Sequence, residues 1–105
     1  MLSNPEDQKL VTLAQATLKR SGAKQAAALR DSTGRTYVAV PVSTPSLSLD
    51  AIEAVFTVAM ASQITGIEAV VFTGDSTAKT AVITEFAPSA AIFFANDGAA
   101  PDKIA

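Results

Sequence analysis

The stretch TGDSTAKTAVITEF, residues 73–86, has the composition of a catalytic or binding loop between a strand and a helix. A β-branched and aromatic run ends just before it, a Gly-Asp turn follows, and a short helix is expected over about 77–86. The stretch offers a serine hydroxyl, a lysine ammonium and the free N–H groups of a helix start. It contains no His or Cys, and neither residue type occurs anywhere in the chain. The usual metal ligands and the commonest general base are therefore missing.

Ser76 and Lys79 match the spacing S-x-x-K, which carries the nucleophile of serine β-lactamases. That motif is short, those enzymes are far longer, and the following Lys-Thr-Ala misses the K-T-G of that group. The alternative interpretation makes Ser76 or Thr77 a helix N-cap and leaves Lys79 solvated, and we favour it. An enzyme with unrelated chemistry around Ser76 and Lys79 stays open as a third hypothesis.

The length and composition of the chain limit its class. Its 105 residues suit one domain, which we place at 1–105, and 49% of them are apolar. The net charge is -2 and the eight basic residues are scattered, so we expect no nucleic-acid partner. No apolar run approaches the ~20 residues of a membrane span. The charged start MLSNPEDQKL lacks the apolar core of a signal peptide. We therefore expect a cytoplasmic protein without a membrane partner.

Two longer helices are predicted by the signals at their ends. The first is expected over 5–20, with Asn4 as N-cap and Pro5 in the first helical position. The second is expected over about 49–63, where Asp50 and Glu53 resemble a capping box. This second helix is apolar nearly all round, which predicts burial on nearly all sides.

Four strands are expected around these helices. Two form a hairpin at roughly 24–30 and 35–42, turning at residues 31–34, and the second is apolar enough to be covered on both faces. The runs IEAVVFTG and AAIFFAND are the third and fourth strands, and the tail AAPDKIA is frayed or a brief extra edge. The resulting order α-β-β-α-β-α-β predicts an α/β fold. We expect a three-layer mixed sheet of four or five strands with helices on both faces.

This order of elements, together with several short sequence motifs, resembles that of the small cytidine deaminases. The family carries V-G-A-A-L, D-G-x-x-Y, V-N-V-E-N-A-S, C-A-E, P-C-G-x-C-R-Q-V-L-x-E-F and L-A-N-x-x-G. This chain has QAAALRDSTGRTY, VPVSTPSLSLDAIEAVF, DSTAKTAVITEF and FFANDG in the same order, covering nearly its whole length. The matching residues are Ala27-Ala28-Leu29, Gly34, Tyr37, Val40, Val42, Ser46, Val82-Ile83, Glu85-Phe86, Ala95-Asn96 and Gly98.

The motifs that carry the family's chemistry are the ones that differ in this chain. In the family, the Asn and Glu of V-N-V-E hold the sugar hydroxyls, and those positions are Pro41 and Ser43 here. The resemblance therefore gives this chain no sugar-binding pair.

The resemblance also indicates a lost zinc site. The family's first zinc ligand falls on Ile52 and its catalytic Glu on Ala54, while its two Cys ligands fall on Ser76 and Lys79. Such a site needs three protein ligands, an open position for water and a Glu that moves the proton. Isoleucine has no donor atom, a lysine ammonium repels a cation, and serine alone is a poor ligand. We expect no cofactor, no bound zinc and no cytidine deamination.

The sequence thus supports a non-catalytic deaminase-like protein that acts as an assembly or regulatory partner. A retained pocket that binds a nucleoside-like small molecule without turnover is the alternative. The family's tetramers, and a second helix more apolar than one sheet face can cover, predict a homo-oligomer, dimer or tetramer. A further protein partner is left open, unidentified by the sequence.

Overall fold

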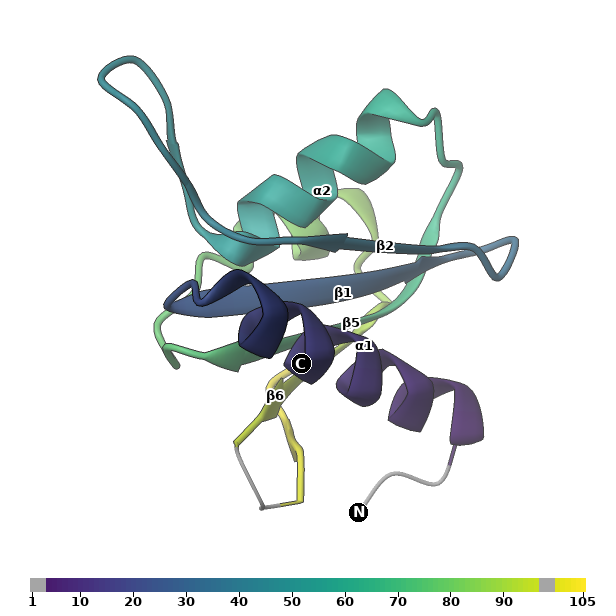
Figure 1. Ribbon diagram of the computed structural model, residues 1–105. Helices are drawn as coiled ribbons and strands as arrows, with labels where there is room; N and C mark the ends of the chain where they lie inside the picture. Colours follow the sequence, from purple (N-terminus) through teal and green to yellow (C-terminus); the bar gives the residue numbers. More distant parts are fainter. Residues whose placement is uncertain (1–3, 97–99) are drawn as a thin grey trace.

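The computed structural model describes residues 4–96 and 100–105. It contains a five-stranded mixed sheet in the order β2-β1-β5-β6-β7, with β5 and β6 parallel and the other neighbouring pairs antiparallel. Figure 1 shows α1 on one face of this sheet and α2 on the other, so the predicted three-layer α/β architecture is confirmed. In chain order the elements are α1 (Pro5–Ser21), β1 (Gln25–Asp31), β2 (Thr36–Ala39), β3 (Val42–Ser43), β4 (Ser48–Leu49), α2 (Ala51–Ala61), β5 (Ile67–Gly74), α3 (Ala81–Phe86), β6 (Ala91–Ala95) and β7 (Asp102–Lys103).

Helix α1 begins and ends where its sequence indicates. The Asn4 side chain accepts a hydrogen bond from the N–H of Glu6 at 2.9 Å, and Pro5 opens the helix. Gly22 ends it in the left-handed conformation, at φ 68°. The helix buries Leu10, Val11 and Ala14 against β1 and β5.

The hairpin of β1 and β2 is built around one carboxylate. Asp31 Oδ1 accepts from the N–H and hydroxyl of Thr33 and from the N–H of Arg35, at 2.7 to 3.0 Å. Gly34 takes φ 91° in this turn, a conformation that glycine adopts without steric cost. The predicted turn is therefore confirmed.

The prediction that the second strand is covered on both faces is wrong. β2 lies at the edge of the sheet and its residues are exposed or half-buried; Val38, for example, keeps 36% of its surface exposed. The strand also ends at Ala39 rather than at 42, because Pro41 has no N–H to donate to a ladder. The segment between β2 and α2 contains a further short hairpin, β3–β4, which projects from the body in Figure 1.

Helix α2 is shorter and more exposed than predicted. It spans Ala51–Ala61, with the predicted capping box of Asp50 and Glu53 in place. Val58 and Met60 remain 44% and 36% exposed, so burial on nearly all sides is wrong for the single chain. The reason is geometric: the sheet covers one side of the helix and α3 touches one flank.

Helix α3 begins at Ala81, and the predicted start near 77 is wrong. Neither Ser76 nor Thr77 is its N-cap; Thr80 takes that position without a side-chain hydrogen bond. The Asp75 side chain accepts from the N–H of Thr77 at 2.9 Å, which folds the preceding segment into a turn.

The last strands complete the sheet. β6 spans Ala91–Ala95 and pairs with β5, while the tail forms the short edge strand β7 on the far side of β6. Asp97, the last residue of the predicted strand AAIFFAND, and Gly98, one of the residues that match the family, lie outside the described residues. Among the residues described, no helix is long and apolar enough to cross a membrane.

Candidate functional site

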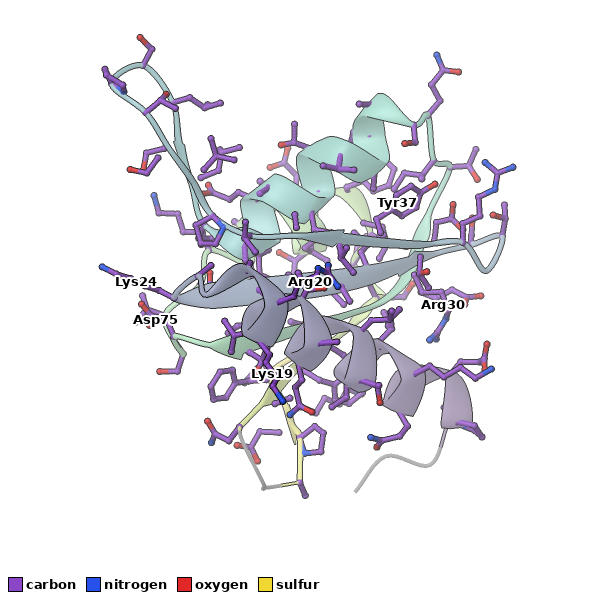
Figure 2. All side chains as sticks on the ribbon, viewed as in Figure 1. Lys19, Arg20, Lys24, Arg30, Tyr37 and Asp75 are labelled. Carbon is purple, nitrogen blue, oxygen red and sulfur yellow. The ribbon has the colours of Figure 1, made fainter. Side chains whose placement is uncertain are left out.

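Two segments meet at the end of the sheet where β1 begins and β5 ends. One is the N-terminus of α2, and the other is the irregular segment 75–80 between β5 and α3. The N–H of Asp75 donates to the carbonyl of Lys24 at 2.9 Å, which fixes the second segment to the start of β1. Figure 2 shows the side chains of Lys24 and Asp75 at this same end. The segment 73–86 therefore lies beside α2, as the resemblance to the deaminases implies.

Asp50 joins the two segments through its carboxylate. Oδ1 accepts from the N–H of Glu53 at 2.8 Å, while Glu53 Oε1 accepts from the N–H of Asp50 at 3.1 Å. Oδ2 accepts from the backbone N–H of Lys79 at 2.6 Å. The capping residue of α2 is thus also a tether for segment 75–80.

Gln25 lies beneath this junction and is only 2% exposed. Its Oε1 accepts from the N–H of Ala51 at 2.9 Å. Its Nε2 donates to the carbonyls of Asp75 and Thr77 at 2.7 and 2.9 Å. One buried amide therefore contacts the first residue of α2 and two residues of the neighbouring segment.

A cavity of about 330 Å³ opens above the junction. Pro41 and Ser43, the positions that correspond to the family's sugar-binding pair, line it, and so does Lys79. The other lining residues are Lys24, Gln25, Val42, Ser48, Leu49, Asp50, Glu53, Asp75 and Thr77. A hollow with polar and charged residues in its lining is therefore present where the resemblance places a substrate pocket.

The charged side chains that line this cavity differ in how many hydrogen bonds and ion pairs they already make within the protein. The carboxylates of Asp50, Glu53 and Asp75 accept the backbone hydrogen bonds given above. Within the described part of the chain, neither Lys24 nor Lys79 takes part in an ion pair. The two ammonium groups are thus the charges with most capacity left for a ligand.

The residues at the zinc positions do not fit a zinc ion. Ile52 is fully buried in the core between α2 and the sheet, and Ala54 is 4% exposed. Ser76 and Lys79 are exposed, and the Lys79 side chain is cationic. Across residues 4–96 and 100–105, no group of three or more carboxylate, histidine or cysteine side chains could hold a metal. The frame that brings the two segments together is present, while its donor atoms are not.

The S-x-x-K pair is not assembled as a nucleophile and base. Three-residue spacing brings two side chains together on a helix, but both residues precede α3. Among the hydrogen bonds of the described residues, none joins the Ser76 hydroxyl to the Lys79 ammonium, and the backbone of Lys79 binds Asp50 instead. The predicted solvation of Lys79 is confirmed.

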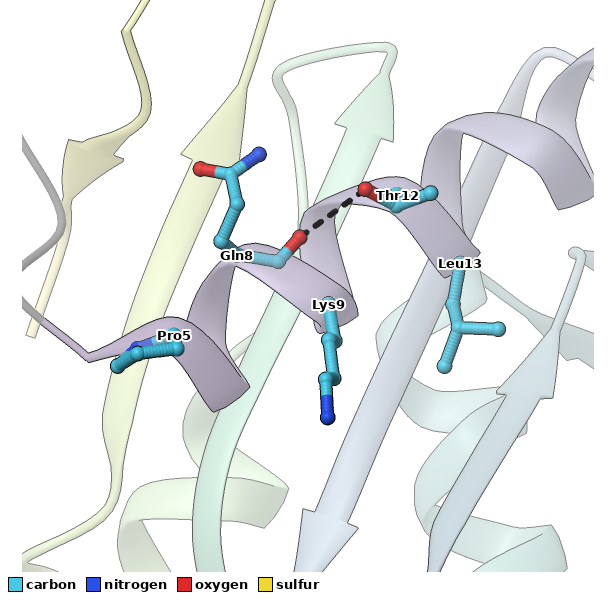
Figure 3. Close-up of a pocket in the computed structure, with 5 residues that line it drawn as sticks. All are labelled: Pro5, Gln8, Lys9, Thr12 and Leu13. Carbon is cyan, nitrogen blue, oxygen red and sulfur yellow. Dashed lines mark hydrogen bonds between the residues drawn. The ribbon is translucent and has the colours of Figure 1, made fainter.

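A second hollow, of about 370 Å³, lies on the outer side of α1. Figure 3 shows that the residues drawn around it come from α1 alone, with Thr12 donating to the carbonyl of Gln8 at 3.2 Å. Its one charged lining side chain, Lys9, is paired with Glu6 at 2.9 Å. Among the described residues, this surface brings together no chemical groups from different elements.

The sequence analysis missed Gln25 and assigned Asp50 only its capping role. The available signal was a single polar residue at the head of the apolar strand run QAAAL. A buried amide in that position must find several hydrogen-bond partners, and those partners come from segments far along the chain.

The arrangement of sheet, helices and cavity defines a deaminase-type fold. The 1.6 Å crystal structure of cytidine deaminase from Burkholderia pseudomallei is similar to this chain with a TM-score of 0.80. The match covers 100% of this chain and 93% of that chain at 18% sequence identity, so it shows a shared fold. No curated protein sequence matches the chain.

A second comparison extends from the fold to the family. The family model described as cytidine deaminase-like matches residues 3–99, which is most of the chain. The chain belongs to the cytidine deaminase-like family.

Proposed function

We propose that this protein is a non-catalytic member of the cytidine deaminase-like family that neither holds zinc nor deaminates cytidine. The observation that carries the proposal is the burial of Ile52 and Ala54 at the start of α2, where a ligand and a proton-transferring Glu are required. Without a metal, nothing lowers the high pKa of water, which supplies almost no hydroxide at neutral pH. The chain has no His or Cys to recruit as a replacement ligand.

Elemental analysis of protein purified without added chelator tests this proposal. We expect no stoichiometric zinc, and no ammonia release from cytidine or deoxycytidine above a heat-killed sample. An active cytidine deaminase assayed in parallel shows that the assay works. Stoichiometric zinc, or turnover that is lost when Ser76 and Lys79 are replaced by alanine, would overturn the proposal.

Binding of a nucleoside-like small molecule without turnover is the second candidate function. The cavity of about 330 Å³ favours it, because its lining combines apolar surface with polar and charged residues. Thermal denaturation with cytidine, deoxycytidine and uridine tests it, because a ligand that binds the folded state raises the melting temperature. The rise should disappear in Ser43→Trp, which fills the cavity. It should persist in Ser46→Trp, at the exposed tip of the β3–β4 hairpin. No shift with any of the three nucleosides would exclude them as ligands.

We propose that the biological role is assembly or regulation and that the chain forms a homo-oligomer, dimer or tetramer. The exposed apolar side chains of Val58 and Met60 on α2 support association. Light scattering over a range of micromolar concentrations measures the assembly directly. A monomer at the highest concentration would contradict self-association and leave a different protein as the partner.

A further inference from the structure

Segment 75–80 needs specific tethers because it has little regular structure of its own. It lies between the end of β5 and the start of α3, and most of its side chains are exposed. Hydrophobic burial therefore holds it only weakly. By resemblance, two of the three zinc ligands of the family fall on this segment and the third on α2, so a zinc ion would join the two.

The Gln25 side chain supplies one direct link between these parts of the chain. Its oxygen accepts from Ala51 in α2, and its nitrogen donates to the carbonyls of Asp75 and Thr77. An amide nitrogen carries two protons, so both are used. At 2% exposure, water cannot readily replace any of these bonds.

Asp50 supplies the second link, to Lys79. One carboxylate oxygen caps α2 through Glu53, and the other binds the N–H of Lys79 at 2.6 Å. A charged acceptor makes this type of hydrogen bond about twice as strong as a neutral one. The two links therefore reach segment 75–80 at both of its ends.

We infer that Gln25 and Asp50 form a hydrogen-bonded clasp that fixes segment 75–80 to the N-terminus of α2 without a metal ion. The clasp occupies the junction that a zinc ion would bridge in the family, and it sets one wall of the cavity above. The inference rests on the metal-free site of the proposed function, and its test uses a different measurement so that the two can fail separately.

Amide hydrogen exchange, followed by NMR, tests each link by itself. Asp50→Asn keeps an oxygen that can cap α2, but it places an NH₂ group where Lys79 needs an acceptor. Exchange at Lys79 should then accelerate by about tenfold or more, while exchange at Glu53 stays unchanged. Gln25→Met keeps the approximate volume and removes all three bonds, so exchange at Ala51, whose N–H donates to Gln25, should accelerate in the same way.

Gln8→Met, on the exposed side of α1, is the matched control and should leave all of these amides unchanged. In the unaltered chain, a chelator should not alter exchange at Ala51 or Lys79. Unchanged exchange at Lys79 in Asp50→Asn would overturn the clasp, even if Gln25→Met did not fold. Acceleration caused by chelator alone would overturn the claim that the junction needs no metal. Zinc found by elemental analysis would overturn the proposed function and leave the two hydrogen-bonded links to be judged by exchange.

Discussion

Arg30 is a buried cation that two carboxylates hold in place. It is 6% exposed, and its guanidinium binds Asp7 at 2.8 Å and Glu68 at 2.7 Å. Burial lowers the pKa of Arg30, but the hydrogen bonds with Glu68 and Asp7 outweigh burial and raise it, so the group stays charged. Among the described residues, its Nη1 has no hydrogen-bond partner, which leaves the buried cation dependent on these two carboxylates.

Removing the buried carboxylate should cost more than removing the exposed one. Asp7→Ala leaves the buried Arg30 cation paired only with the half-exposed Glu68, and we expect a loss of about 3 kcal/mol in the free energy of unfolding. Glu68→Ala should cost about 1 kcal/mol or less, because water can reach that side of the pair. The Glu68 side chain is 49% exposed, against 13% for Asp7. Urea denaturation measures both, and equal losses would show that burial does not decide the cost.

Asp31 predicts a pH dependence. Burial raises the pKa of Asp31, but hydrogen bonds from Thr33, Arg35 and Tyr37 outweigh it and hold the pKa below its ordinary value. The unfolded chain therefore binds a proton more readily. The stability that this group contributes is present above its unfolded pKa of about 4 and is lost as the pH falls through the folded pKa.

Asp31→Asn should weaken that dependence, because the amide does not titrate and its oxygen can still accept in the turn. Urea midpoints from pH 7 to pH 2 should fall less steeply for this variant than for the unaltered chain. Asp102→Asn, on the exposed strand β7, is the control. Parallel curves for Asp31→Asn and the unaltered chain would refute the assignment.

At the scale of elements, the packing of α2 on the sheet predicts which isoleucine contributes most to the free energy of unfolding. Ile52 is fully buried, so Ile52→Ala should lower the free energy of unfolding by about 2–5 kcal/mol through lost burial and a cavity. Ile104 is 53% exposed near the tail, and Ile104→Ala should change stability by less than about 0.5 kcal/mol. Denaturant titration of both variants checks this, and a small effect at Ile52 would place its side chain outside the core.

The elements that the sequence predicted correctly are those with local signals. Asn4 and Pro5 begin α1, and Asp50 with Glu53 begins α2, because capping needs only residues within one turn. The errors concern neighbours that lie far away in the chain. The exposure of β2 depends on its place at the sheet edge, and the late start of α3 depends on a turn and on the distant Asp50.

The candidate site divides in the same way. The order of short sequence motifs predicted the location of the site. In the structure, Pro41, Ser43 and Lys79 line one cavity there. The hydrogen bonds that hold the site together could not be predicted from the sequence. The partners of Gln25 lie at least 26 positions further along the chain. Pattern and capping signals carry no information about such contacts.

For the whole molecule, the exposed face of α2 predicts how copies associate. Met60 on α2 and Leu13 on α1 are both 36% exposed, so they are matched in accessibility but lie on opposite layers. If α2 forms the interface, Met60→Lys should shift sedimentation toward monomer, while Leu13→Lys should leave the assembly intact. The same shift in both variants would indicate that the added charge, and not the α2 surface, decides the result.

The position of β1 between β2 and β5 also has a kinetic consequence. Its hairpin with β2 closes through the short turn at Asp31, and hairpins form in about 1–10 μs. Its pairing with β5 joins Gln25 to Gly74 and must first close a long loop that contains α2, at a larger entropic cost. β1 should therefore enter the folding transition state with β2 and serve there as the template on which β5 docks. In stopped-flow experiments, Thr33→Ala in the turn should mainly slow folding, whereas Ile92→Val on β6 should mainly speed unfolding.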